Sequence, residues 1–323
     1  MATSPPFHMS NSPKDRGLQR VLLQPSLVDW VAIVYLSATL ATLVWGEPGA
    51  ARTHFLLYVG GILVAYVLAV AVYRWLKPTG PVGQRLYRCT PLVAGCAVYF
   101  RLPDIYPIVH PTDLDAQLHQ IDLWLVGTDL SVWLEPHTTG LMVDWLSFFY
   151  WLYFPLVVLT TSWAILVSTQ PARRTSFATG AIVVILVGIF TYTLVPGIGP
   201  WHFLADDYEA PLRGGAFYEW MWDIYRMGVG RDIFPSVHTA LSLWTTIFLV
   251  WERRAHRGVW AALAFVGFLT ANIMVATIVL RWHYLVDLLA GMVLAGIGAM
   301  VASRGLRWYE TRRQAAGVEP GYW

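Results

Sequence analysis

Runs of mostly apolar residues, each close to the length of a helix that crosses a bilayer, recur along this 323-residue chain. A transmembrane helix needs about 20 such residues to cross the hydrocarbon core. The pattern therefore predicts an all-α, polytopic membrane protein, a bundle of about eight transmembrane helices, of which the third is short. The predicted spans are roughly 28–46, 54–76, 88–103, 142–168, 176–195, 236–251, 258–279 and 283–303.

Two connections between the predicted spans are long, 104–141 and 196–235. The second opens with the run Pro196-Gly197-Ile198-Gly199-Pro200-Trp201. Long connections in a compact protein usually carry function. In the first, apolar residues follow helical spacing, which predicts an amphipathic helix lying in the membrane interface. These residues are Leu114, Leu118, Ile121 and Leu125.

Composition and charge agree with a membrane protein and orient it. Of the residues, 56% are hydrophobic and 13% charged, against about 25% charged in soluble domains. Most of the 22 basic residues fall in alternate connections or in the polar tails 1–26 and 304–323. Because cytoplasmic connections carry an excess of Lys and Arg, both termini are predicted inside and both long connections outside.

The same composition bears on location and partners. Arginine is far commoner than lysine, which indicates a bacterium, so we expect an integral protein of a bacterial plasma membrane (with the site luminal in a eukaryote). The net charge of +2 follows the topology and predicts no nucleic-acid partner. The sequence leaves the oligomeric state open.

Two histidines begin the sixth and eighth predicted spans, in Phe234-Pro235-Ser236-Val237-His238 and in Arg281-Trp282-His283-Tyr284-Leu285-Val286-Asp287. The topology puts both at the outer face. His283 and Asp287 are one helical turn apart, so their side chains can meet. Asp287 is then expected to accept the Nδ1–H of His283 and leave Nε2 free to attack. The alternative for His283 is an interfacial aromatic belt with Trp282 and Tyr284.

Pro235 and Ser236 are typical of a helix start, with Ser236 as the N-cap or a first-turn residue. The simplest interpretation is a capping motif followed by an incidental histidine. The free backbone N–H groups of such a start also favour an anion, and the helix dipole adds to the attraction. His238 would then stand beside a bound phosphate as general acid and base.

The two histidine motifs resemble the second and third signature motifs of the phosphatidic acid phosphatase type 2 superfamily. Within it, the chain is most similar to the inositol phosphorylceramide synthase branch. The resemblance covers roughly residues 88–303 and implies the six-helix core of the superfamily there, preceded by two further helices in 27–87. The similar features are Gly199-Pro200-Trp201 after a span, the region 122–127, Tyr150 and Tyr153, and the His-Tyr-x-x-Asp form of the last motif.

The resemblance implies a phosphotransferase without metal or cofactor, with His238, His283 and Asp287 as catalytic residues and a phosphohistidine intermediate. An inositol-phosphate-like head group would move from a phosphatidylinositol-like donor to ceramide or another lipid alcohol. A lipid phosphate phosphatase would use the same residues with water as acceptor. A transporter is a third alternative, but the ionisable residues cluster at one face rather than along a path through the bilayer.

The sequence departs from the superfamily pattern at its phosphate-binding residues. The first motif, a lysine followed by Arg-Pro, is missing from the predicted outer face, and Thr277 replaces an arginine before the last motif. We therefore expect Ser236, Arg231 and Arg281 to bind the phosphate, with ordinary solvated charge as the alternative for each arginine. The other histidines of the predicted outer side are His110, His119, His137 and His202. They do not have the tight spacing of metal ligands, so no metal is expected.

Overall fold

The computed structural model describes residues 13–76, 80–253 and 258–320 of the chain. It is 80% helical, and the described residues form no strand, which confirms the predicted all-α class. The α-helices are α1 (Pro13–Leu22), α2 (Leu27–Trp45), α3 (Ala50–Leu76), α4 (Pro81–Tyr99), α5 (Leu102–Val109), α6 (Asp115–Val126), α7 (Leu130–Leu134), α8 (Gly140–Ser162), α9 (Pro171–Leu194), α10 (Pro200–Phe203), α11 (Ala216–Met227), α12 (Val237–Glu252), α13 (Val259–Val279), α14 (Leu285–Met300) and α15 (Leu306–Ala315). Short 3-10 turns are η1 (Glu135–His137) and η3 (Ala205–Asp207), and π-helical segments are η2 (Trp163–Val167) and η4 (Val301–Gly305).

Each of the eight predicted spans coincides with a helix. Within the described ranges, six helices are long and apolar enough to cross a membrane, and a seventh candidate is the pair α4 and α5, bent by 61°. This bend falls where the third predicted span ends. The remaining helix, α12, has 16 residues and is shorter than the candidate spans. The predicted number of eight therefore corresponds to seven candidate spans and one shorter helix.

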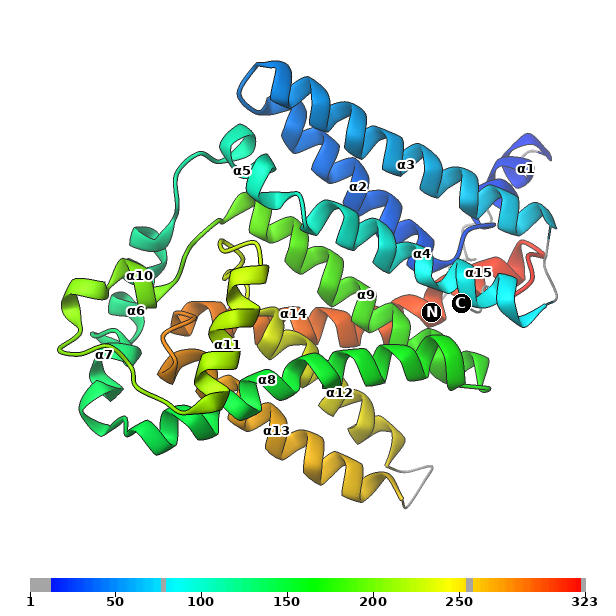
Figure 1. Cartoon of the computed structure of the whole chain (residues 1–323). Coiled ribbons are helices and arrows are strands. Elements are labelled where there is room, and N and C mark those ends of the chain that lie inside the picture. Colours follow the sequence, from blue (N-terminus) through cyan, green and yellow to red (C-terminus); the bar gives the residue numbers. More distant parts are fainter. Residues whose placement is uncertain (1–12, 77–79, 254–257, 321–323) are drawn as a thin grey trace, which may run out of the picture.

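The helices run back and forth between two ends of the molecule (Figure 1). α1 and α15 lie at one end, on the right of the picture. α5, α6, α7 and α10 lie at the other, which we call the loop end. Both long connections therefore gather at the end of the bundle where α12 and α14 begin. Which side of the membrane the loop end faces stays a prediction.

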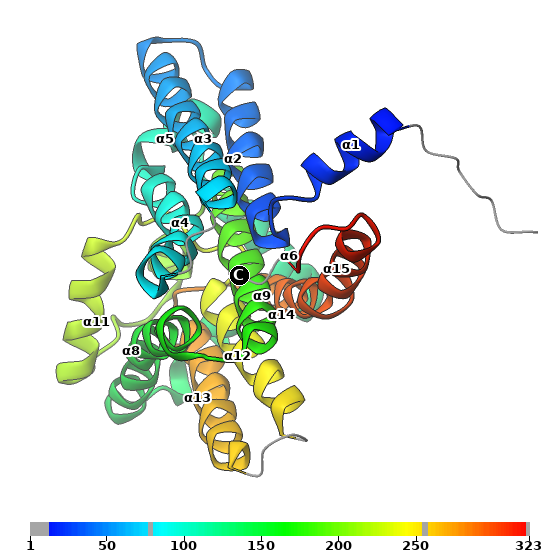
Figure 2. The ribbon, with the colours of Figure 1, turned by 90° about the vertical axis from the view of Figure 1, so that its right-hand side faces the viewer.

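α9 is the central helix of the bundle (Figure 2). It packs against α2, α4, α12 and α14. Glycines permit this close approach, because a methyl group at Gly180 would overlap the ring of Trp244 and one at Gly188 would overlap Val237. α9 therefore holds α12, the helix that carries His238, directly against the core.

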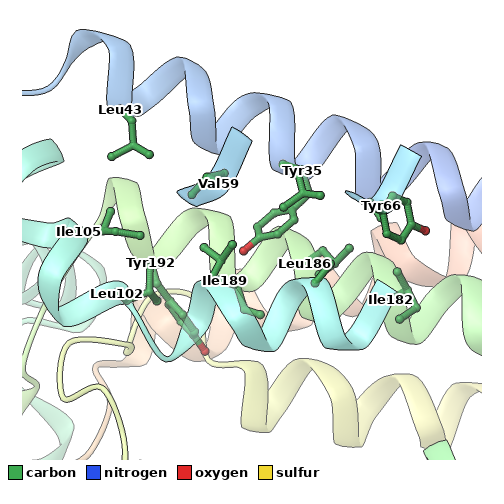
Figure 3. Close-up of a cluster of buried hydrophobic side chains, with 14 of the residues drawn as sticks. Tyr35, Leu43, Val59, Tyr66, Leu102, Ile105, Ile182, Leu186, Ile189 and Tyr192 are labelled. Carbon is green, nitrogen blue, oxygen red and sulfur yellow. The ribbon is translucent and has the colours of Figure 1, made fainter. Parts of the chain in front are cut away.

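One buried hydrophobic cluster joins the N-terminal helices to the rest of the bundle (Figure 3). It contains Tyr35 of α2, Val59 of α3 and Leu102 of α5, together with Leu186 and Tyr192 of α9. The predicted division into 27–87 and 88–303 stays a prediction, and the two segments share this core.

A buried carboxylate, Asp29, ties α2 to its neighbours near the end opposite the loop end. It accepts hydrogen bonds from the Ser26 amide at 2.6 Å and from the Tyr66 hydroxyl at 3.3 Å. The Tyr87 hydroxyl donates to it at 2.6 Å, and Arg74 pairs with it at 3.2 Å. A carboxylate buried in this way needs such partners, because an unpaired buried charge is costly.

α15 packs against the turn that precedes α2. The Arg313 guanidinium, which is buried, donates to the carbonyls of Leu23, Gln24 and Pro25. The Tyr309 hydroxyl donates to the Pro25 carbonyl at 2.8 Å. The turn before the first span is thus held by a residue 289 positions after Gln24.

α6 forms where the spacing of apolar residues predicts a helix. Its buried residues are Asp115, Leu118 and Asp122. Ile121 and Leu125 of the predicted apolar stripe are 40% and 39% exposed. The face that α6 turns toward the protein therefore combines Leu118 of the stripe with two carboxylates, and the position of α6 in the membrane interface stays a prediction.

Candidate active site

α12 and α14 pack against each other, and each begins at one of the two histidine motifs. Ser236 is the N-cap of α12, where its side chain accepts from the Thr239 amide at 3.3 Å. Tyr284 is the N-cap of α14, and its amide donates to Asp287 at 2.9 Å. Polar side chains in these positions satisfy N–H groups that a helix start leaves open. The caps therefore place His238 in the first turn of α12 and His283 directly before α14.

Asp287 and His283 are in contact, as their spacing predicts. The Asp287 Oδ2 atom lies 3.2 Å from the His283 Nδ1 atom. The side chains are 0% and 3% exposed, so little water competes for this interaction. A carboxylate that accepts the Nδ1–H of an imidazole fixes the tautomer in which Nε2 is the free base.

His238 faces the same site from α12, with 6.0 Å between its ring centroid and that of His283. Tyr150 and Tyr153 of α8 pack against the His238 ring at centroid distances of 4.5 and 4.2 Å. The His238 Nε2 atom is buried and has no hydrogen-bond partner among the described residues. A buried polar atom without a partner needs an explanation, and a bound substrate group would supply one here.

The first turn of α12 presents backbone N–H groups beside the histidines. The Ser236 amide is not one of them, because it donates to the Asp287 carbonyl at 3.0 Å. The next two amides, those of Val237 and His238, precede the first intrahelical hydrogen bond, and no described residue accepts from them. They can therefore bind an anion, which the dipole of α12 also favours.

The first turn of α14 is instead occupied by side chains of α6. Asp122 accepts from the amides of Leu285 and Val286 at 2.6 and 2.9 Å. Asp115 accepts from the Tyr284 hydroxyl at 3.0 Å. Because these carboxylates already satisfy the start of α14, the start of α12 is the better anion site of the two.

Arg231, one predicted phosphate ligand, lines a cavity of about 390 Å³ at the loop end. Its Nε atom lies 2.8 Å from the Asp113 carboxylate, and its guanidinium lies 5.8 Å from the centre of the Tyr106 ring. Tyr106, Trp201 and Tyr225 line the same cavity. The cavity thus combines one arginine with several aromatic rings.

Arg281, the other predicted arginine ligand, is engaged by protein groups. Its guanidinium pairs with Glu135 at 2.9 Å and donates to the Ala210 carbonyl at 3.1 Å. It also stacks on the Tyr208 ring, 3.5 Å from the ring centre. The side chain is 7% exposed. Its expected role in phosphate binding stays a prediction.

Asp232 is an acidic residue near the site that the sequence did not single out. Its Oδ2 atom accepts from the Tyr99 hydroxyl at 2.6 Å. Burial raises the pKa of Asp232, and the hydrogen bond from Tyr99 and the nearby His283 act in the opposite direction. The sequence feature that could have identified Asp232 was its position next to Arg231, at the end of the second long connection.

The two long connections also contain His110, His119, His137 and His202. Within the described ranges, no group of three or more His, Cys, Asp or Glu side chains is arranged to hold a metal ion. His119 lies instead 3.6 Å from the Asp129 carboxylate.

The chain is similar to a known protein family over the segment that builds this site. A family model described as the PAP2 superfamily matches residues 116–301. This segment contains both histidine motifs and more than half of the chain. No curated protein and no solved structure matches the chain.

Proposed function

The chain belongs to the PAP2 superfamily, and from this premise we propose that it is a membrane phosphotransferase that moves a phosphorylated head group between lipids. The observation that carries the proposal is the buried contact between His283 and Asp287, with the ring of His238 at 6.0 Å. This arrangement supplies a nucleophile, a residue that orients it and a separate acid and base.

The proposed reaction has two steps. The Nε2 atom of His283 forms a bond to phosphorus, and the bond from phosphorus to the departing lipid alcohol breaks as protonated His238 gives that alcohol a proton. In the second step, His238 takes the proton of the incoming hydroxyl, whose oxygen bonds to phosphorus while the histidine–phosphorus bond breaks. Asp287 stabilises the positive charge on the His283 ring in the intermediate.

The phosphoryl oxygens are proposed to bind at the start of α12. Charge spreads over these oxygens in the transition state, so fixed N–H groups and cations stabilise it. Ser236 contributes as the cap that orients the open amides of Val237 and His238. Both arginines pair with a carboxylate, Asp113 or Glu135, but Arg231 is the preferred cation, because it lines a cavity and is 28% exposed, whereas Arg281 is 7% exposed.

The proposed donor is a phosphatidylinositol-like lipid, and the proposed acceptor is ceramide or another lipid alcohol. The cavity lined by Tyr106, Trp201, Tyr225 and Arg231 supports a head group that is both hydroxylated and charged. Ligand pockets commonly combine apolar walls with a few polar groups that fix orientation. We place the reaction at the extracytoplasmic face of a bacterial plasma membrane, following the charge asymmetry of the connections.

The test uses the purified full-length protein in vesicles that contain phosphatidylinositol, with and without ceramide or diacylglycerol. Transfer predicts a phosphorylated acceptor lipid that forms only when the acceptor is present. Release of water-soluble inositol phosphate or phosphate at the same rate without acceptor would favour the phosphatase alternative.

A pair of histidine variants gives the control. His283→Ala should lose turnover, whereas His54→Ala should keep it, because His54 is an exposed residue of α3. Both variants should show the thermal unfolding of the wild type. Turnover that survives in His283→Ala would contradict the proposed nucleophile. Movement of substrate across the membrane without turnover, in both variants, would favour a transporter.

A further inference from the structure

Arg281 occupies a backbone conformation that normally selects glycine. Among the described residues, it is the non-glycine residue with a positive φ, 65°. Its amide donates to the Ile278 carbonyl at 2.9 Å, and the Trp282 amide donates to the Thr277 carbonyl at 3.0 Å. These two hydrogen bonds define a Schellman motif at the end of α13, whose left-handed residue is usually glycine. A side chain there carries a steric cost, so its contacts require explanation.

The Arg281 side chain joins the two long connections at one point. Its guanidinium pairs with Glu135 of the first connection at 2.9 Å. It binds the second connection through the Ala210 carbonyl at 3.1 Å and the Tyr208 ring. An arginine whose two terminal nitrogens bind different acceptors, and whose plane stacks on a ring, is held more rigidly than a lysine would be.

The two connections also bind each other beside Arg281. The Glu135 carboxylate accepts from the amides of Glu209 and Ala210 at 3.1 and 3.0 Å. The hydroxyls of Ser131 and Tyr208 lie 2.6 Å apart. Residues 131–135 and 208–210 therefore form one unit with the guanidinium.

The backbone of the same turn is held by the second connection. The Arg281 carbonyl accepts from the Trp201 amide at 2.8 Å. Gly199, with φ of 103°, approaches so closely that a methyl group there would meet the Trp282 carbonyl oxygen at 2.6 Å. His283 follows one residue later, and its amide donates to the Thr277 carbonyl at 3.0 Å. The position of the His283 backbone is thus set by Trp201 and Gly199 of the second connection and by Thr277 of α13.

We propose that Arg281 is a positioning residue, which aligns His283 by fastening both long connections to the turn before it. The inference rests on the proposed function in taking His283 as the nucleophile. In this role Arg281 does not contact the phosphate. It acts on His283 indirectly, through its contacts with Glu135 and Tyr208. Alignment of this kind matters because a displacement of about 1 Å can cost on the order of a hundredfold in rate.

Glu135→Gln gives the sharpest test, since it removes the charged partner and leaves Arg281 in place. We expect kcat on phosphatidylinositol vesicles to fall by on the order of tenfold or more, with KM nearly unchanged. Were Arg281 a phosphate ligand, releasing it from Glu135 would keep kcat and lower KM. That result would overturn the proposal.

Variants of Tyr208 and Arg281 distinguish the ring contact of the guanidinium from its ion pair with Glu135. Tyr208→Phe keeps the ring under Arg281 and should retain most of the rate, whereas Tyr208→Ala should lose as much as Glu135→Gln. Arg281→Gly suits the left-handed turn but has no side chain, so it should fold well and still show the low kcat. A Glu135→Gln/Arg281→Gly double variant should be no slower than the slower single variant, because both changes break one unit. Losses that multiply would contradict the inference.

Asp223→Asn provides the matched control. Asp223 pairs with Arg226 on the surface of α11, where the side chains are 66% and 69% exposed. Exposed pairs of this kind contribute little. This variant should keep the kcat and KM of the wild type, and a loss equal to that of Glu135→Gln would contradict a specific role for the pair at Arg281.

Hydrogen exchange tests the proposal without any turnover, so its outcome is independent of the proposed reaction. In Glu135→Gln, exchange should rise at 209–210, whose amides Glu135 binds, and also at 281–286. A rise confined to 209–210 would mean that the connections do not hold the turn before His283, and would overturn the inference.

Discussion

The Ser236 amide donates a hydrogen bond to the Asp287 carbonyl at 3.0 Å. The residue that contacts His283 through its carboxylate therefore also binds, through its backbone, the cap of the helix that carries His238. The two histidine motifs lie far apart in the chain but are joined at this residue. Small displacements of α14 relative to α12 must then change the separation of the two imidazoles.

Asp287→Asn should reduce kcat strongly while leaving the fold intact. The amide oxygen of asparagine can still accept from the Tyr284 amide, but the side chain no longer stabilises a positively charged His283 ring. In a comparable hydrolase triad, this change costs about 10⁴-fold, and we expect a loss on the order of a hundredfold or more. Turnover and thermal unfolding should be measured together. Wild-type turnover would show that the contact is structural.

Gly291→Ala should separate α12 from α14. A methyl group at Gly291 would meet the Ser236 carbonyl oxygen at 2.5 Å, so the helices must move apart. Overpacking of this kind costs about 1–3 kcal/mol, and turnover should fall with it. Gly296→Ala on the same helix is the control, because nothing lies within 4 Å of its added methyl group. Equal unfolding temperatures for the two variants would contradict the close approach.

Tyr150 should matter through its ring rather than its hydroxyl. The ring stacks on His238 at a centroid distance of 4.5 Å and an interplanar angle of 24°. Tyr150→Phe keeps this contact and should retain most of the kcat. Tyr150→Ala frees the His238 ring and should lower kcat by about tenfold or more. If both variants fall equally, the hydroxyl has a part in the reaction that ring packing does not explain.

Acid should weaken the contacts at Glu135. Burial acts to raise the pKa of Glu135, but hydrogen bonds from the Ala210 and Glu209 amides and the charge of Arg281 outweigh it and lower the pKa. A carboxyl with a lower pKa in the folded state stabilises the fold above its ordinary pKa, about 4.3, and loses that effect as pH falls through the folded value. The unfolding temperatures of wild type and Glu135→Gln should therefore differ most near neutral pH and converge in acid. A constant difference would contradict this linkage.

The local parts of the fold and site could be predicted from the sequence. Apolar runs located the spans, because burial in a membrane selects apolar residues over the full length of a helix. The contact between His283 and Asp287 followed from helical geometry, since residues four apart share one face. Ser236 was predicted as a cap from its residue type and its place after a proline.

Contacts between distant segments could not be predicted in this way. Asp122 binds amides at the start of α14, 163 positions from Leu285, and such a pairing leaves no periodic pattern in the sequence. The stacking of Tyr150 on His238 depends on how α8 packs against α12. The sequence marked Arg281 only as a candidate phosphate ligand. Its left-handed turn at the end of α13 gave no signal, because glycine ordinarily marks such a position.

The binding of Arg313 to the turn before α2 has a consequence for biogenesis. During synthesis, α2 is made long before α15, so the carbonyls of Leu23, Gln24 and Pro25 cannot meet Arg313 until the helices between them have been made. The order of translation therefore leaves the turn before α2 without these hydrogen bonds until α15 is made. Its final docking is therefore a late step, which follows the synthesis of the segment between Pro25 and Arg313.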